Sequence, residues 1–146
     1  MSAKDIEVTF SDSGRIQAKL FSPLINRYGG KEPYMEFPKG FRVFIYDSAV
    51  HVESTITGNY GKRLEASRIM EAKGNVIVRN EITKKQMNTE ELTWDENKRM
   101  IYSNVKVKIT TADKVLFVEG LESNESFTWY KFRRVTGEMM VKKDSI

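Results

Sequence analysis

The stretch Asn104-Val105-Lys106-Val107-Lys108-Ile109 alternates polar and apolar side chains along its length. Because successive side chains of a β-strand point to opposite faces, this alternation predicts a strand with one buried face. A related stretch, Asn75-Val76-Ile77-Val78, begins 29 residues earlier, and a further step of about that length reaches Arg134-Val135-Thr136-Gly137. The repeat predicts self-similar hairpins stacked in order, which favours an elongated antiparallel roll over a compact barrel.

Similar runs rich in β-branched and aromatic residues occupy most of the chain, which predicts an all-β protein. Besides residues 75–79 and 105–109, we expect strands at residues 6–10, 15–21, 41–46, 49–57, 62–72, 86–94, 100–103, 115–118 and 126–136. Residues 63–72 also have a weak helical pattern, but its spacing is mixed and we interpret the segment as a strand.

Residues typical of turns separate these runs. Ser11-Asp12-Ser13-Gly14 and Asp95-Glu96-Asn97-Lys98 predict tight hairpin connections. Gly58-Asn59-Tyr60-Gly61 and Lys73-Gly74 predict two more reversals of the chain. Residues 28–40 contain two of the three prolines and predict a longer loop that covers one end of the sheet.

The composition argues against catalysis. The 146 residues suffice for one domain with a core, and 24 Lys and Arg against 20 Asp and Glu give a net charge of +4. The absence of cysteine excludes disulfides, thiolate zinc sites and cysteine nucleophiles, and His51 is the only histidine. The acidic pairs Glu90-Glu91 and Asp95-Glu96 lie beside or within turns or point to opposite strand faces. We therefore expect no enzyme, no metal and no cofactor.

Two kinds of binding remain open from the residues alone. The segment from Trp129 to Arg134 mixes aromatic and basic side chains, as a nucleic-acid- or carbohydrate-binding β module would. The net charge is small and no second segment of this kind exists, so we expect no nucleic acid partner and keep this function as the alternative. The apolar strand faces could instead form a sleeve for an apolar ligand, although alternation does not distinguish a sleeve from an ordinary core.

Several stretches resemble, in order and spacing, the LptC family of lipopolysaccharide-export proteins. They are residues 10–20 with the first predicted hairpin, Phe41-Arg42-Val43-Phe44-Ile45-Tyr46-Asp47, Leu64-Glu65-Ala66-Ser67, Ala72-Lys73-Gly74-Asn75-Val76-Ile77-Val78, Thr89-Glu90-Glu91-Leu92-Thr93-Trp94-Asp95, and Gly120-Leu121, which matches a late strand-to-turn glycine. The resemblance extends from about Val8 to Met139. The sequence departs from the family in residues 28–40, where a short connection is expected, and in the aromatic residues 127–134.

The resemblance implies a single OstA-like β-jelly-roll domain, residues 5–141, with an open apolar groove. It implies an adaptor that accepts lipopolysaccharide from an inner-membrane ABC transporter complex and passes it to a neighbouring OstA-like protein of the periplasmic bridge. The implied location is the periplasm, with anchoring to the inner membrane by a segment not present in this chain.

Two sets of residues follow from this interpretation. The alternate apolar positions of the central strands are expected to bind lipid, namely Phe41, Val43, Ile45, Val76, Val78, Leu92, Trp94, Val105, Val107 and Phe117. A register error of one residue would exchange them for their neighbours. The first and last strands are expected to contact partners through Ile6, Val8, Phe10 and Ile16 at one end and Phe127, Trp129, Lys131 and Arg133 at the other. Unpaired strand edges there also predict edge-to-edge self-association.

Overall fold

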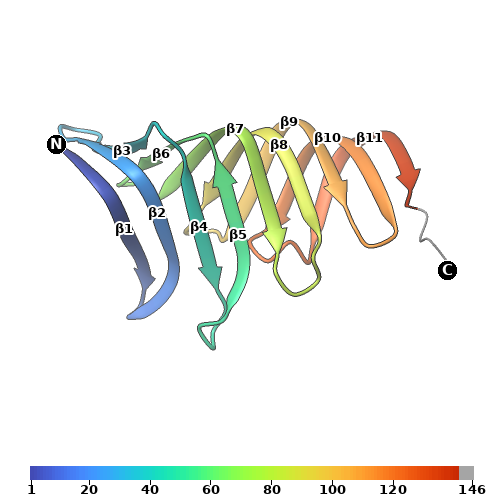
Figure 1. Ribbon diagram of the computed structural model, residues 1–146, viewed down its shortest axis with the longest axis horizontal. Helices are drawn as coiled ribbons and strands as arrows, with labels where there is room; N and C mark the ends of the chain where they lie inside the picture. The colour runs from blue at the N-terminus through green and yellow to red at the C-terminus, as the bar shows by residue number, and fades with distance from the viewer. Residues whose placement is uncertain (142–146) are drawn as a thin grey trace.

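The computed structural model describes residues 1–141, which form eleven strands of one antiparallel sheet and no helix. The strands are β1 (Ser2–Asp12), β2 (Arg15–Tyr28), β3 (Tyr34–Phe37), β4 (Phe41–Tyr46), β5 (Val52–Gly58), β6 (Tyr60–Leu64), β7 (Ile69–Asn80), β8 (Gln86–Asp95), β9 (Met100–Thr110), β10 (Lys114–Asn124) and β11 (Tyr130–Met140). Figure 1 shows an elongated body with β1 at one end and β11 at the other. The predicted all-β, elongated antiparallel roll is confirmed.

The short strands β3 to β6 are halves of two longer, bent strands. Both β3 and β4 pair with β2, and both β5 and β6 pair with β7, always antiparallel and in continuous order. The chain therefore keeps its direction from β3 into β4 and from β5 into β6. The predicted reversal at Gly58-Asn59-Tyr60-Gly61 is wrong, because this segment is a bend within one continuous path along β7.

The longer strands bend at matching positions. Pairing between β7 and β8 is interrupted between Lys73 and Val76, and pairing between β9 and β10 is interrupted on either side of Gly120. Left-handed backbone conformations mark these bends, with φ of 78° at Gly74, 46° at Asn75 and 69° at Gly120. The predicted reversal at Lys73-Gly74 and the predicted strand end at Gly120-Leu121 are therefore wrong. A residue with positive φ can make a bulge inside a strand as well as a turn between strands.

Together the bends form one line across the sheet, which we call the corner line. Its members lie in or beside the gaps of the cross-strand register, at neighbouring positions of adjacent strands, and are Asp5, Ser22, Gly40, Asn59, Gly74, Asn75, Glu90, Asn104 and Gly120. The line divides the sheet into two walls. The β3–β6 wall holds β3, β6 and the strand segments beside them, and the β4–β5 wall holds β4, β5 and the segments on the other side of the line.

Side chains satisfy the backbone groups that the bends release from the strand ladders. The carboxylate of Glu90 accepts a hydrogen bond from the backbone N–H of Asn75 at 3.1 Å. The hydroxyl of Ser22 donates to the backbone oxygen of Gly40 at 2.8 Å. The Ser22 contact is buried, and because a buried backbone group without a partner is costly, it stabilises the bend at Gly40.

The 29-residue repeat has a structural basis in the corner line. Asn75 lies at the bend of β7, and Asn104 lies at the bend of β9, two strands further along the sheet. The third copy, at Arg134-Val135, lies in β11, after two more strands. Each repeat therefore corresponds to one hairpin that crosses the corner line twice.

Connections between strands differ from the predictions in two further places. A turn at residues 65–68 joins β6 to β7, so residues 62–72 are two strands rather than one. Residues 125–129 connect β10 to β11, where the Asn124 side-chain oxygen accepts the N–H groups of Thr128 and Trp129 at 3.0 Å each. The predicted strand at residues 126–136 therefore begins only at Tyr130. The hairpins after Asp12 and Asp95 are confirmed.

The core lies between the two walls and forms one cluster of apolar side chains. Phe10 of the β4–β5 wall meets Trp94 of the β3–β6 wall edge to face, with ring centroids 6.1 Å apart. The cluster continues along the body to Leu121 and Phe127 near β11. Because alternate residues of each strand enter this space, the period-two pattern of the sequence reflects a single long core.

Candidate functional site

Most of the predicted lipid-binding residues lie inside this core. Phe41 is the most exposed of them at 6%, while Val43, Ile45, Val76, Val78, Leu92, Trp94 and Val107 are each 3% exposed or less. The interior is filled by these side chains rather than open to solvent. Alternation therefore placed these residues on the inner face correctly, and their contact with lipid stays a prediction.

Phe117 and Val105 are the two exceptions. Phe117 pairs with Lys108 on the outer face of the sheet and packs against Gly137, so its predicted inward orientation is wrong. Its neighbours Leu116 and Val118 are buried instead. Val105 follows the bend of β9, is half-buried and lies outside the core cluster. A bend or a one-residue shift of register is enough to move a side chain off the inner face.

The predicted partner-binding residues fall into exposed and buried groups. Ile16 and Trp129 are 37% and 48% exposed, and Lys131 and Arg133 are exposed too. Ile6 and Val8 are half-buried and pack against the core cluster. Phe10 and Phe127 are 3% and 0% exposed, so a role at the surface is wrong for both. Phe127 stacks on Tyr130, with ring centroids 5.0 Å apart.

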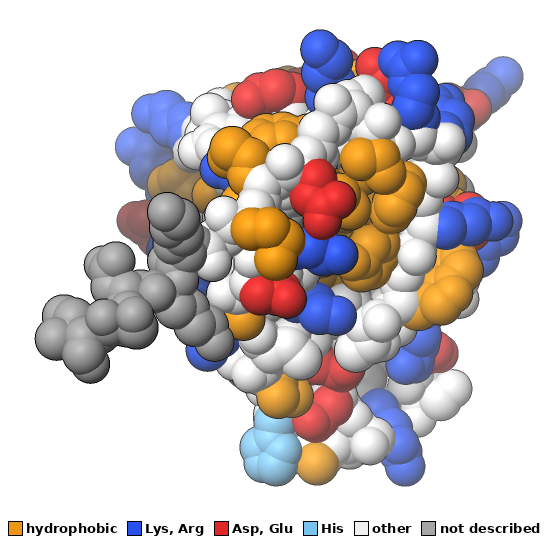
Figure 2. Space-filling model, turned by 90° about the vertical axis from the view of Figure 1, so that its right-hand side faces the viewer, with side chains coloured by type: hydrophobic (Ala, Val, Ile, Leu, Met, Phe, Trp, Pro, Cys, Tyr) orange, Lys and Arg blue, Asp and Glu red, His pale blue; other side chains and the backbone are white. Residues whose placement is uncertain are grey.

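The last strand gives one end of the body an apolar surface, which we call the β11 end. It is formed by Trp129, Phe132, Val135, Met139 and Met140, each at least 36% exposed. Figure 2 views this end and shows several hydrophobic patches with charged side chains among them. In the described part of the chain β11 pairs with β10 only, so its other edge is free. Exposed apolar patches beside a free strand edge are typical of contact surfaces.

Basic side chains near this end are already engaged. Lys131 lies 3.4 Å from a Glu122 carboxylate oxygen, and Arg134 lies 2.7 Å from one of Glu119. Arg133 donates to the backbone oxygen of Asn104 at 2.9 Å. These contacts reduce the free positive charge that a nucleic-acid site would need.

Opposite the corner line, polar side chains join the free ends of the two walls. We call this seam the mouth. Gln17 donates to the backbone oxygen of Glu96 at 3.2 Å, and Ser54 donates to the backbone oxygen of Glu125 at 2.7 Å. Asn80 donates to the backbone oxygen of Ser126. The seam therefore closes the interior through hydrogen bonds rather than through a continuous backbone.

A buried ion pair lies beside the mouth. Arg63 binds the Glu96 carboxylate through two hydrogen bonds of 2.7 and 3.0 Å, and Arg68 approaches the same carboxylate at 3.5 Å. The Arg63 guanidinium also lies 4.3 Å from the centroid of the Phe10 ring. Paired charges of this kind are costly to separate, so they hold the β8–β9 turn in place.

Glu125 is the second buried carboxyl of the mouth and is 8% exposed. Its Oε2 accepts a hydrogen bond from the Trp94 indole N–H at 2.6 Å and a weaker one from Gln17 at 3.5 Å. Burial raises the pKa of Glu125 to about 7, against the lowering effects of the Trp94 hydrogen bond and of Arg99. The side chain therefore changes its charge close to neutral pH.

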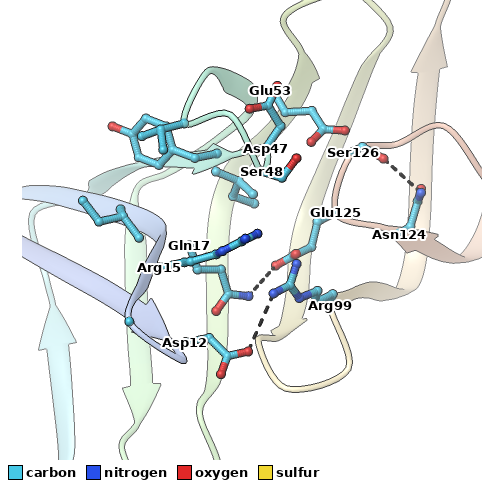
Figure 3. Close-up of a pocket in the computed structure, with 15 residues that line it drawn as sticks. Asp12, Arg15, Gln17, Asp47, Ser48, Glu53, Arg99, Asn124, Glu125 and Ser126 are labelled. Atoms are coloured by element: carbon cyan, nitrogen blue, oxygen red, sulfur yellow. Dashed lines mark hydrogen bonds and ion pairs between the residues drawn. The ribbon is translucent and has the colours of Figure 1, made fainter.

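A polar pocket of 780 Å³ opens at the mouth. Figure 3 shows the side chains around it, which come from the β1–β2 hairpin, the β4–β5 hairpin, the β8–β9 turn and the β10–β11 turn. Its charged lining residues are Asp12, Arg15, Asp47, Glu53, Arg99 and Glu125. No sequence pattern indicates this pocket, because its residues are far apart along the chain.

Two further findings on the described residues concern metal binding and membrane-spanning helices. Within residues 1–141 no group of His, Asp and Glu side chains has a metal-binding arrangement. The same residues include no helix with the length and hydropathy of a membrane span.

Comparison with known families decides between the remaining interpretations. The family described as lipopolysaccharide-assembly, LptC-related, matches residues 2–126. The chain belongs to the LptC family. The match covers β1 to β10 and the start of the following turn, and β11 follows it. No curated protein matches the sequence significantly.

Membership of the LptC family gives the chain a role in lipopolysaccharide transport. The family consists of components of the periplasmic transport bridge and is not known for catalysis, and its partners are lipopolysaccharide and other bridge proteins.

Proposed function

We propose that the protein encloses the acyl chains of lipopolysaccharide between its two walls. In this proposal it receives the lipid from an inner-membrane ABC transporter and passes it to the next jelly-roll protein. The observation that supports it is the single apolar core, which runs from Phe10 near β1 to Phe127 near β11. Such a core offers an apolar path along the length of the body.

The acyl chains need space that the closed interior does not provide. The two walls share every long strand at the corner line, whereas the mouth is joined by side-chain hydrogen bonds. Net, each hydrogen bond contributes about 1 kcal/mol to stability, so the mouth is the weaker side. We therefore infer that the walls part at the mouth and bend at the corner line when lipid enters.

The energetics of this step fit a conduit. Burying apolar surface yields about 25 cal/mol per Å², which amounts to tens of kcal/mol for a lipid with several acyl chains. Displacing the packed core and ordering the lipid oppose this gain, so net affinity is far smaller. Direction then comes from ATP hydrolysis by the transporter, and this protein supplies a shielded path.

Photo-cross-linking from inside and outside the same strand tests the proposal. Val78 is 0% exposed and faces the interior, whereas the adjacent Ile77 faces the outer side. We expect a benzophenone amino acid at position 78, but not at position 77, to form an adduct with purified lipopolysaccharide. Equal labelling at the two positions, or none at position 78 with the circular dichroism spectrum unchanged, would contradict the proposal.

A further inference from the structure

The pocket at the mouth has the properties of a site for a small polar ligand. Its volume of 780 Å³ falls within the range of about 300–1,000 Å³ that is usual for such sites. Ile45, a core residue that is 3% exposed, forms part of its lining. The pocket therefore lies where the apolar interior meets solvent.

Two side chains in this pocket have polar groups that are free to bind a ligand. Arg15 makes no ion pair with any residue of the described chain, and Figure 3 shows its side chain reaching into the pocket. Glu125 is buried, and its Oε1 makes no hydrogen bond with residues 1–141, while Oε2 holds Trp94 and Gln17. Every side-chain oxygen or nitrogen that is fully buried in that range has a hydrogen-bond partner. Because Oε1 has none, it is not fully buried and is reached from the pocket.

The other charged groups of the pocket are largely occupied. Asp12 pairs with Arg99 at 3.6 Å. An oxygen of Asp47 accepts the backbone N–H groups of Ala49 and His51 at 2.9 Å each. Glu53 is the exception, because it is half-buried in the lining and its carboxylate has no hydrogen-bond or ion-pair partner within residues 1–141. Arg15 is therefore the cation left free to meet an anion from solvent.

We propose that this pocket binds a phosphorylated sugar headgroup, with the phosphate on Arg15 and a sugar hydroxyl on Glu125. The proposal rests on the proposed function, because lipopolysaccharide joins acyl chains to phosphorylated sugars. A guanidinium matches two phosphate oxygens at once, and a carboxyl group suits a hydroxyl. Tyr46, which also lines the pocket, offers an aromatic surface to the sugar ring. When the acyl chains lie in the interior, the headgroup of the same molecule lies at the mouth.

The Trp94 indole provides a reporter for this site, because its N–H binds Glu125 directly. The chain has two tryptophans, so the W129F variant leaves one indole signal in a ¹H–¹⁵N NMR spectrum. We expect titration with glucosamine 1-phosphate to shift this signal in a saturable manner. Glucose, which has only the sugar, and inorganic phosphate, which has only the phosphate, are titrated in parallel. Each is expected to bind more weakly than glucosamine 1-phosphate.

Two arginine variants in the W129F background give the matched comparison. Arg15→Gln removes both charge-assisted hydrogen bonds to the phosphate and is expected to weaken binding of glucosamine 1-phosphate at least about tenfold. Arg79→Gln changes an exposed arginine outside the pocket and should alter affinity less than about twofold. An unshifted indole signal, or equal affinity in the two variants, would overturn the assignment.

Two other results separate the possible failures. If inorganic phosphate binds as tightly as the sugar phosphate, the pocket is a free-phosphate site and the headgroup assignment is wrong. If the sugar phosphate does not bind but position 78 still cross-links to lipopolysaccharide, this inference fails while the proposed function stands.

Discussion

Glu125 connects the chemistry of the mouth to the stability of the protein. Its backbone oxygen accepts from Ser54 of the opposite wall, and its buried carboxyl receives the Trp94 indole N–H. Its charged neighbours are Arg99, which favours the ionised form, and Glu96, which disfavours it. Burial outweighs the favourable contacts, so the carboxyl keeps its proton to a higher pH in the folded protein than in the unfolded chain.

The free energy of unfolding is therefore expected to fall as pH rises. The pKa of Glu125 is about 7 in the folded state against 4.5 for the free group, so unfolding releases a proton between these values. The stability contributed by the neutral carboxyl is complete below pH 4.5 and is lost by about pH 7, by an amount on the order of 3 kcal/mol. Urea denaturation at pH 5 and pH 8 measures the difference.

The Glu125→Gln variant is the control for this prediction. Glutamine keeps an oxygen for the Trp94 indole but does not ionise, so most of the difference between pH 5 and pH 8 is expected to disappear. A variant with the same pH dependence as the natural protein would show that another group is responsible.

The position of a residue in the fold could be predicted where it depends on neighbours along the same strand. Val78 was placed inside correctly, because alternation along one strand decides its face. Gln17, Ser54 and Glu125 were missed, because the mouth joins residues 71 to 108 positions apart. A buried polar side chain has no local pattern when its partners come from distant strands.

At the scale of strands, the bend between β5 and β6 depends on the absence of side chains. The ring of Phe41 lies over Gly58 and Gly61, where a Cβ atom at Gly61 would approach Phe41 Cδ1 to 2.8 Å and Met70 Cε to 2.9 Å. From the sequence alone, these glycines predict a reversal of the chain. Their actual role is to let an aromatic ring pack against a continuous, bent backbone.

Gly61→Ala is expected to destabilise the protein by about 1–3 kcal/mol, because the methyl group overpacks the core at Phe41. Gly29→Ala is the matched substitution, since a Cβ there has no neighbour within 4 Å and its φ is not in the left-handed range. It should change the free energy of unfolding by less than about 0.5 kcal/mol. Urea denaturation of both variants checks this, and equal effects would show that the close approach at Gly61 is relieved without cost.

The number of strands could be predicted only in part, for a related reason. Turn residues such as Gly and Asn also occupy bends with positive φ, so Gly74-Asn75 and Gly120 resembled strand ends. Conversely, residues 65–68 form a turn that contains no glycine or proline. Whether a bend continues or reverses the chain is decided by pairing with the neighbouring strand, which sequence patterns do not show.

At the scale of the whole molecule, the ends of the body are expected to associate. The β11 end presents a free strand edge and exposed apolar side chains, and a strand from a second copy would satisfy both. We expect sedimentation velocity to show association that increases with protein concentration. Val135→Glu, which places a charge on the 47% exposed Val135, should weaken this association at least tenfold.

Val50→Glu is the control for association. Val50 is 56% exposed but lies in the β4–β5 connection, away from the β11 end. This variant should associate as the natural protein does, and both variants should keep the circular dichroism spectrum of a β protein. Equal loss of association in the two would show that general surface charge, rather than the β11 end, controls it.

Because of the corner line, the length of the body can change independently of its cross-section. Each hairpin of about 29 residues crosses the line twice, so one more hairpin would lengthen both walls and the core together. Neighbouring strands are about 4.8 Å apart, so each such unit would advance the body by about 10 Å without changing its cross-section. Gene segments of that size could be gained or lost while every remaining cross-section stays the same. A gap between two membranes can then be spanned equally well by one long chain or by several short ones joined end to end.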